Sequence, residues 1–270
     1  MAKKQPLQPP VGAKVKLSDY DPAYAGGLTK GEALDAKMEK DLERLSQLQE
    51  AFYAEGKRAL LVILQAIDTG GKDGTIRHVF RGLDPHGVQV TAFKQPSEEE
   101  LAHDFLWRVH KATPRKGLIG VFNRSHYEDV LIVRVHGLVP ESVWRERYDH
   151  INRFEEMLTE HGTTILKFFL YISKDEQKKR LEERRDTPDK RWKFSLGDLK
   201  ERQRWDEYIA AYEDVLTKCN TPYARWHIVP ANRKWYRNYI VTRTLVETLE
   251  KLNPQFPQPE SDYSGVQIPE

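Results

Sequence analysis

Residues 60–80 read "LLVILQAIDTGGKDGTIRHVF" and sharply narrow the choice of folds. The stretch opens as a continuous apolar run, which is typical of a central parallel strand buried on both faces. Glycines follow at positions 70, 71 and 74 with Lys72 between them, and a helix-like segment comes next. A buried strand that runs through a glycine-rich turn into a helix is the layout of a phosphate-binding loop, or P-loop. This layout predicts an α/β fold built on a parallel sheet.

The rest of the chain alternates between strand-like and helix-like segments. The expected strands are 59–65, 87–93, 117–122, 163–173 and 226–231. The expected helices are 29–55, 97–110, 141–160, a charged stretch from 174 to about 204 interrupted at Pro188, a helix ending at Lys218, and 235–252. Ser97 with Glu100, and Ser173 with Glu176, are expected to cap two of these helices. Alternation without an internal repeat predicts a five-stranded parallel sheet covered by helices on both faces.

Length, charge and cysteine content limit the kind of protein. The chain has 270 residues and a formal net charge of only +2, so any attraction for a polyanion must come from local clusters of Lys and Arg. Its single cysteine, Cys219, cannot form an internal disulfide, which suggests a reducing compartment. The apolar runs are too short to span a bilayer, and the first ten residues do not resemble a secretion signal. We therefore expect a cytoplasmic protein with an arm over 1–27, a main domain over 28–258 and a tail over 259–270.

The glycine-rich turn departs from the usual P-loop pattern at two positions. Ala66 stands where the pattern has glycine, and Asp73 follows the lysine where Ser or Thr normally supplies a magnesium ligand. Asp68, inside the loop, is the candidate substitute, because a carboxylate among phosphates is repelled unless it holds a cation or orients a nucleophile. The alternative is an ordinary glycine-rich turn with a surface lysine.

A second group of polar residues follows the third expected strand. The strand ends in Asn123-Arg124-Ser125, and the acids Glu128 and Asp129 come a few residues later. An arginine at the carboxyl end of a strand, beside a phosphate loop, can clamp phosphoryl oxygens with its planar group of donors. Alternatively, Arg124 pairs with a helix carboxylate for structural reasons alone.

The third feature is the highly charged segment 174–204. Arg180 and Arg184 are one helical turn apart and can face the same way. Such a segment can form a lid that closes arginines over a transferring phosphate and excludes water. It can equally be a solvated helix face. Trp192 and Lys193 could flank a base or pack the hinge, and core packing is the expectation for Trp192.

Three motifs resemble the polyphosphate kinase 2 family: "DTGGKDGT", "FNRSHYEDV", and the lid segment with Arg180, Arg184, "WK" and Asp198. The resemblance extends over roughly residues 30–258 and includes Asp68 and the late acids. It implies a three-layer P-loop kinase fold of the thymidylate-kinase-like type with a helical lid. It also implies reversible transfer of the terminal phosphate of inorganic polyphosphate to a nucleotide, with Mg²⁺ or Mn²⁺. Overall similarity favours the subclass that converts AMP to ADP and ADP to ATP, with purines preferred.

The motifs and the resemblance together give a set of site residues. The expected catalytic residues are Asp68, Lys72, Arg124, Arg180 and Arg184. The expected phosphate-binding residues are Thr69, Gly70, Gly71, Lys72, Asp73, Gly74, Thr75, Asn123, Arg124 and Lys193. The expected metal ligands are Asp68, Glu128 and Asp129.

Two other functions fit parts of this pattern. An ATP-dependent nucleoside monophosphate kinase would share the fold and lid but would use ATP as donor. A non-catalytic module for anions or nucleic acid would use the basic patch of the lid, but it leaves the combination of Asp68, Lys72 and Arg124 unexplained. The expected partners are polyphosphate and adenine or guanine nucleotides, with neither nucleic acid nor membrane, and the resemblance implies a homodimer or homotetramer.

Overall fold

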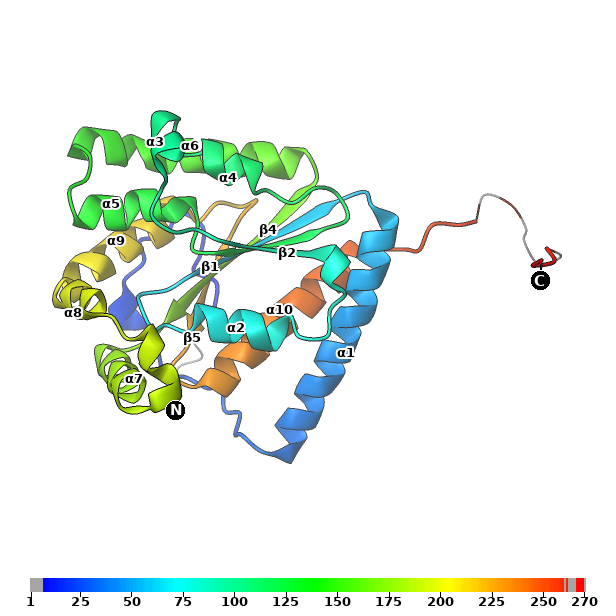
Figure 1. Ribbon diagram of the computed structural model, residues 1–270, viewed down its shortest axis with the longest axis horizontal. Coiled ribbons are helices and arrows are strands. Elements are labelled where there is room, and N and C mark those ends of the chain that lie inside the picture. Colours follow the sequence, from blue (N-terminus) through cyan, green and yellow to red (C-terminus); the bar gives the residue numbers. More distant parts are fainter. Residues whose placement is uncertain (1–6, 260, 262–265, 270) are drawn as a thin grey trace.

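A computed structural model describes residues 7–259, 261 and 266–269, and in it one parallel sheet organises the chain. The strands are β1 Ala59–Gln65, β2 Val88–Ala92, β3 Ile119–Asn123, β4 Thr163–Tyr171 and β5 Trp226–Pro230. They lie in the order β2-β3-β1-β4-β5, and every neighbouring pair is parallel (Figure 1). All residues of β1 are buried, as its apolar sequence predicts for the central strand. The expected five-stranded parallel sheet is confirmed.

Helices cover both faces of the sheet and give the three layers expected (Figure 1). The longer helices are α1 Glu32–Glu55, α2 Lys72–Val79, α6 Glu141–Glu160, α7 Lys174–Asp186, α8 Leu196–Gln203, α9 Trp205–Lys218 and α10 Lys234–Leu252. The short ones are α3 Glu98–Ala102, α4 Trp107–Lys111 and α5 Ile132–Val135, with 3₁₀ helices at Leu17–Asp19, Pro85–Gly87, His126–Val130 and Pro188–Lys193. Helices α1, α2 and α10 lie on one face, and α4, α5, α6 and α9 lie on the other (Figure 1).

Strand register brings the two polar motifs together. Leu64 of β1 pairs with Asn123 of β3, so both strands end at the same level. The backbone N–H of Arg124 donates to the carbonyl oxygen of Leu64 at 3.1 Å. The loop after β1 and the segment after β3 therefore leave the sheet side by side, at the edge where parallel α/β sheets bind ligands.

The helix expected over 97–110 is instead two short helices, so that prediction is wrong. The capping box at its start is present, because Ser97 Oγ accepts from Glu100 N at 3.2 Å and Glu100 Oε2 accepts from Ser97 N at 2.8 Å. The chain then leaves the helix at His103, and Asp104 Oδ1 accepts from Leu106 N at 2.9 Å. An aspartate that bonds to the backbone two residues ahead favours a turn over a continuing helix.

The lid segment differs from expectation in two details. Ser173 caps α7 by accepting from Glu176 N at 3.2 Å, but the Glu176 carboxylate accepts from Arg180 Nε at 2.7 Å instead of closing a capping box. Helix α7 ends before Pro188, as predicted, since the preceding residue is extended. Trp192, expected in the core, is 79% exposed because the 3₁₀ turn that carries it lies on the surface.

The N-terminal arm packs on its own chain. Leu17 is fully buried, and Leu7 accepts through its carbonyl from Ile228 N of β5 at 2.7 Å. Residues 1–6 of the arm and 260, 262–265 and 270 of the tail lie outside the described residues. The division into arm, domain and tail stays a prediction. Within the described part of the chain, no helix combines the length and apolar character needed to cross a membrane.

Candidate active site

The P-loop connects β1 to α2 through a strained backbone. A Cβ atom on Gly70 would lie 2.4 Å from Cβ of Ala66 and 2.8 Å from the carbonyl oxygen of Ile67, so only glycine fits there. Gly71 has φ 103°, a conformation that glycine adopts readily. Thr69 is left-handed too, with φ 65°, which is unfavourable for a β-branched residue. Strained backbone conformations of this kind are frequent at ligand-binding sites. They indicate that contacts with the rest of the fold hold the loop in this conformation.

The polar side chains of the loop bond mainly to nearby protein groups. Lys72 Nζ donates to the carbonyl oxygen of Ala66 at 2.9 Å, and Thr75 Oγ1 donates to that of Gly71 at 3.1 Å. Burial, with a contribution from the nearby guanidinium of Arg124, lowers the pKa of Lys72. The amide N–H groups at the start of α2 add the positive end of a helix dipole. The arrangement favours binding of an anion.

Thr69 and Asp73 occupy different positions relative to the loop. The Thr69 hydroxyl is buried and has no hydrogen-bond partner within the ranges that the structure describes. A buried hydroxyl without a partner is unfavourable, so Thr69 is available to a bound group. Asp73 is exposed, and its Oδ1 accepts from Asn123 Nδ2 at 2.6 Å. That hydrogen bond ties the start of α2 to the end of β3.

Arg124 faces the P-loop from the neighbouring strand. Its Nη2 donates to Oδ1 of Asp68 at 3.0 Å. Burial acts against its charge, but the carboxylates of Glu128 and Asp68 outweigh burial and raise the pKa of Arg124. Its backbone is left-handed, with φ 64°, a second non-glycine residue in this conformation beside the same site. The partner of Arg124 is thus a loop carboxylate and not the helix carboxylate that the alternative interpretation required.

Of the three candidate metal ligands, the structure brings two together. Asp68 and Glu128 line one small cavity of about 40 Å³ with Arg124. The amide of Gln65, oriented to suit its partners, donates to Glu128 Oε1 at 3.0 Å. Burial raises the pKa of Glu128. Asp129 does not line this cavity.

Asp129 instead belongs to an ion pair with α6. Its Oδ1 accepts from Arg147 Nη1 at 2.9 Å, and the side chains of both residues are largely buried. Burial raises the pKa of Asp129 to about 6 in spite of the guanidinium beside it.

The lid residues reach the loop in different ways. Arg180 is 6% exposed and donates to four carbonyl oxygens, those of Thr69, Gly70, Ala231 and Asn232, at 3.0, 3.2, 2.6 and 3.2 Å. It supports the loop from α7. Arg184, one turn further on, pairs with Asp198 Oδ2 of α8 at 3.3 Å. Lys193 lies in the 3₁₀ turn with Nζ 4.8 Å from the centre of the Trp192 ring.

Several residues at the cavity were missed from sequence. Tyr208 and Tyr212 of α9 line it, and Tyr208 Oη donates to Glu201 Oε2 at 2.6 Å. The sequence signal for these two tyrosines was their spacing of four residues, which places them on the same face of a helix. Packing of that face in the apolar core would explain the same spacing equally well. Asp198, which the lid motif already included, pairs with Arg184, and burial and then the charge of Asp68 raise the pKa of Asp198.

The carboxylates of the site fit a divalent cation that is shared with a substrate. Within the ranges 7–259, 261 and 266–269, no group of three or more His, Cys, Asp or Glu side chains is arranged to hold a metal ion. Magnesium, however, is usually bound by one or two carboxylates together with substrate phosphates and water. The paired carboxylates of Asp68 and Glu128 fit that mode and do not fit an all-protein metal cage.

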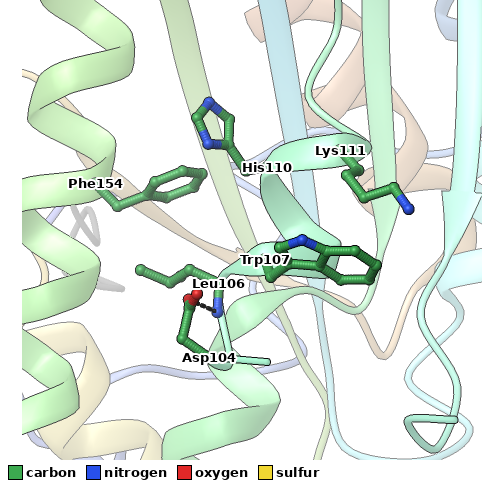
Figure 2. A pocket seen from close by; sticks show the side chains of 6 residues that line it. All are labelled: Asp104, Leu106, Trp107, His110, Lys111 and Phe154. Carbon is green, nitrogen blue, oxygen red and sulfur yellow. Dashed lines mark hydrogen bonds between the residues drawn. The ribbon is translucent and has the colours of Figure 1, made fainter. Parts of the chain in front are cut away.

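A larger hollow lies away from the P-loop, between α4 and α6 (Figure 2). Its volume is about 470 Å³, and its lining residues are Asp104, Leu106, Trp107, His110, Lys111 and Phe154. The face of Trp107 is already covered, since the His103 ring stacks on it at 4.0 Å and Lys111 Nζ lies 4.0 Å from its centre. This hollow has neither the glycine loop nor the facing carboxylates of the site.

The fold and the site define the class of the protein. A central parallel strand leads into a P-loop with a lysine and the carboxylate of Asp68, and Arg124 and Glu128 face that loop from the segment after β3. These are the features of P-loop phosphotransferases, which act by positioning and charge stabilisation.

Comparisons with known proteins identify the family. The profile of polyphosphate kinase 2 (PPK2) matches residues 29–257, and the chain belongs to this family of enzymes. The chain is 56% identical to the AMP/ADP-polyphosphate phosphotransferase of Meiothermus ruber over 270 residues, covering 98% of this chain and 99% of that one. It is 46% identical to the ADP-polyphosphate phosphotransferase of Rhodopseudomonas palustris over 263 residues, covering 92% and 90%. The crystal structure of polyphosphate kinase 2 from Arthrobacter aurescens TC1 has a TM-score of 0.90 and 49% identity, covering 95% and 92%.

Proposed function

We propose that this enzyme transfers the terminal phosphate of inorganic polyphosphate to AMP and then to ADP, reversibly, with a divalent cation. Membership of the polyphosphate kinase 2 family supports polyphosphate as the donor. The names of two relatives support the acceptors, since one is an AMP/ADP-polyphosphate and the other an ADP-polyphosphate phosphotransferase. The observation that carries the proposal is the P-loop with Lys72 and Asp68, faced by Arg124, which donates to Asp68.

Each group of site residues has its own role in phosphate transfer. The amides of Gly70, Gly71 and Gly74, with Lys72, hold the phosphate that is transferred. Arg124 neutralises charge as it moves between donor and acceptor in a loose, in-line transfer, so no covalent enzyme intermediate is needed. Mg²⁺ would be held by Asp68 and Glu128 and would screen the charge of the phosphates, with Mn²⁺ as an alternative. Asp68 additionally orients the acceptor phosphate.

The lid and the loop flanks complete the phosphate site. Arg184 and Lys193 contribute positive charge from the lid, and Arg180 holds the loop backbone in the shape that binds phosphate. Thr69, Asp73, Thr75 and Asn123 surround the phosphate, and Thr69 offers a hydroxyl that has no hydrogen-bond partner in the described part of the chain. Asp129 forms an ion pair with Arg147 and is not a direct metal ligand in this proposal.

We further propose an enzyme that works in the cytoplasm on adenine and guanine nucleotides. It is a homodimer or homotetramer, and it needs no nucleic acid or membrane partner. Because polyphosphate carries about one negative charge per phosphate, binding should weaken as the salt concentration rises.

One assay separates this proposal from an ATP-dependent monophosphate kinase. The protein is incubated with AMP and Mg²⁺ and with either polyphosphate or ATP, and the nucleotides are separated by chromatography over time. Polyphosphate should yield ADP first and then ATP. Formation of ADP from ATP and AMP, with no product from polyphosphate, would contradict the proposal.

A further inference from the structure

Arg237, on α10, lies against the P-loop although no sequence motif marked it. Its side chain is 3% exposed. A Cβ atom on Gly71 would lie 1.9 Å from Nη1 of Arg237, and one on Gly74 would lie 3.5 Å from its Nη2. The guanidinium therefore fills the space beside the loop that a side chain at position 71 would need. Nη1 of Arg180 approaches the same point from α7, at 3.6 Å from that Cβ position on Gly71.

The charge of Arg237 has little compensation. Its Nε and Nη2 donate to Oδ1 of Asn238 at 3.1 and 2.8 Å. Among the residues that the structure describes, no carboxylate lies within ion-pair distance of Arg237. Burial, and then the nearby charge of Arg180, lower the pKa of Arg237 to about 10. The group still carries its charge at neutral pH, and a buried cation without a counter-charge is unfavourable.

We propose that Arg237 is part of the phosphate site of the P-loop, and that a phosphate bound at the loop is the anion that compensates its buried charge. This inference rests on the proposed function, because it takes the loop to be where phosphate binds. A side chain at position 71 would displace the guanidinium, in addition to straining a backbone with φ 103°. Binding of a phosphate at the loop explains why two arginines converge on it although Arg180 already holds the backbone.

Binding of tripolyphosphate without nucleotide tests the proposal. The Kd is measured by calorimetry for the wild type, for Arg237→Met and for a control, Arg243→Met. Arg243 lies on the same helix but pairs with Asp41 and Glu247. Arg237→Met should raise the Kd about ten-fold or more, because a charged donor to phosphate is lost, and Arg243→Met should leave it unchanged. The ligand-free Arg237→Met protein should melt at or above the wild-type temperature, since an uncompensated charge has been removed.

The outcomes separate this inference from the proposed function. If Arg237→Met binds tripolyphosphate as tightly as the wild type, Arg237 is structural and the inference is overturned while the proposed function stands. If Arg237→Met does not fold, Arg237→Gln decides by the same criterion, because glutamine keeps a polar side chain but carries no charge. If the wild type binds no tripolyphosphate, the loop is not a phosphate site and both proposals fail.

Discussion

A buried ion pair behind the active site gives the sharpest stability prediction. Lys167 of β4 and Glu155 of α6 are both fully buried, and Lys167 Nζ donates to Glu155 Oε2 at 2.6 Å. The same ammonium donates to Tyr127 Oη at 2.8 Å and to the carbonyl oxygen of Cys219 at 2.7 Å. Tyr127 also donates to Glu155 Oε1 at 2.7 Å. Since Tyr127 lies between Arg124 and Glu128 in the chain, this network fixes the segment that carries both site residues.

Replacing Lys167 by Met should cost about 3–5 kcal/mol of unfolding free energy, because it leaves a buried carboxylate without its cation. That is a large part of the 5–15 kcal/mol typical of a folded domain. The double variant Lys167→Met with Glu155→Gln should be less destabilised than the sum of the two single changes, since no unpaired charge remains. Turnover should fall as well, because Tyr127 loses a partner.

Urea unfolding followed by circular dichroism measures these differences. Burial alone would raise the pKa of Glu155, but Lys167 and the neighbouring His126 outweigh burial and hold the pKa of Glu155 below its ordinary value. A lowered pKa means that the stabilisation is fully present above about pH 4.5 and is lost as the pH falls through the folded-state pKa. The Lys167→Met variant should lack this acid-side loss. A loss of less than about 1 kcal/mol in the single variant would refute the reasoning.

Three further predictions concern the loop, the cysteine and the lid. Gly70→Ala should lose about 1–3 kcal/mol in urea unfolding, together with turnover, because its Cβ would lie 2.4 Å from that of Ala66. Gly31→Ala, with nothing within 4 Å of its Cβ, is the control, and equal stability of the two variants would contradict this. The Cys219 thiol, buried and with its pKa raised to about 12, should react with a thiol reagent only after unfolding, and rapid reaction in the native protein would be the opposite result. Arg184→Gln should change stability by less than about 1 kcal/mol, since its ion pair is partly exposed, but should slow phosphate transfer, and full turnover would rule out its role.

The sheet could be predicted from sequence because its strands are long apolar runs with polar ends. Strand β1 has the bounds that the pattern predicts, 59–65, and its turn has glycine where a Cβ atom would collide. The stretch 97–110 was predicted as one helix but forms two. The turn between them depends on the side chain of Asp104, and the spacing of hydrophobic residues gives no sign of it.

The positions of the candidate site residues could be predicted where a motif places them and not where only tertiary packing does. Asp68 and Arg124 follow adjacent strands, so strand register alone brings them together. Arg237 comes from a helix more than 160 positions later in the chain than Gly71, and no local pattern distinguishes a buried arginine from an exposed one. The opposite error occurred at Trp192, where aromatic character suggested the core but the short 3₁₀ turn leaves the ring in solvent.

The central claim is that Lys72 and the P-loop hold the phosphate that moves from polyphosphate to a nucleotide. The most direct test is the initial rate of ATP formation from ADP and polyphosphate by Lys72→Met, compared with the wild type and with Lys116→Met, which removes an exposed lysine before β3. Lys72→Met should be slower by about 10²-fold or more while remaining folded, and Lys116→Met should match the wild type. A folded Lys72→Met protein that keeps more than roughly a tenth of the wild-type rate would contradict the account.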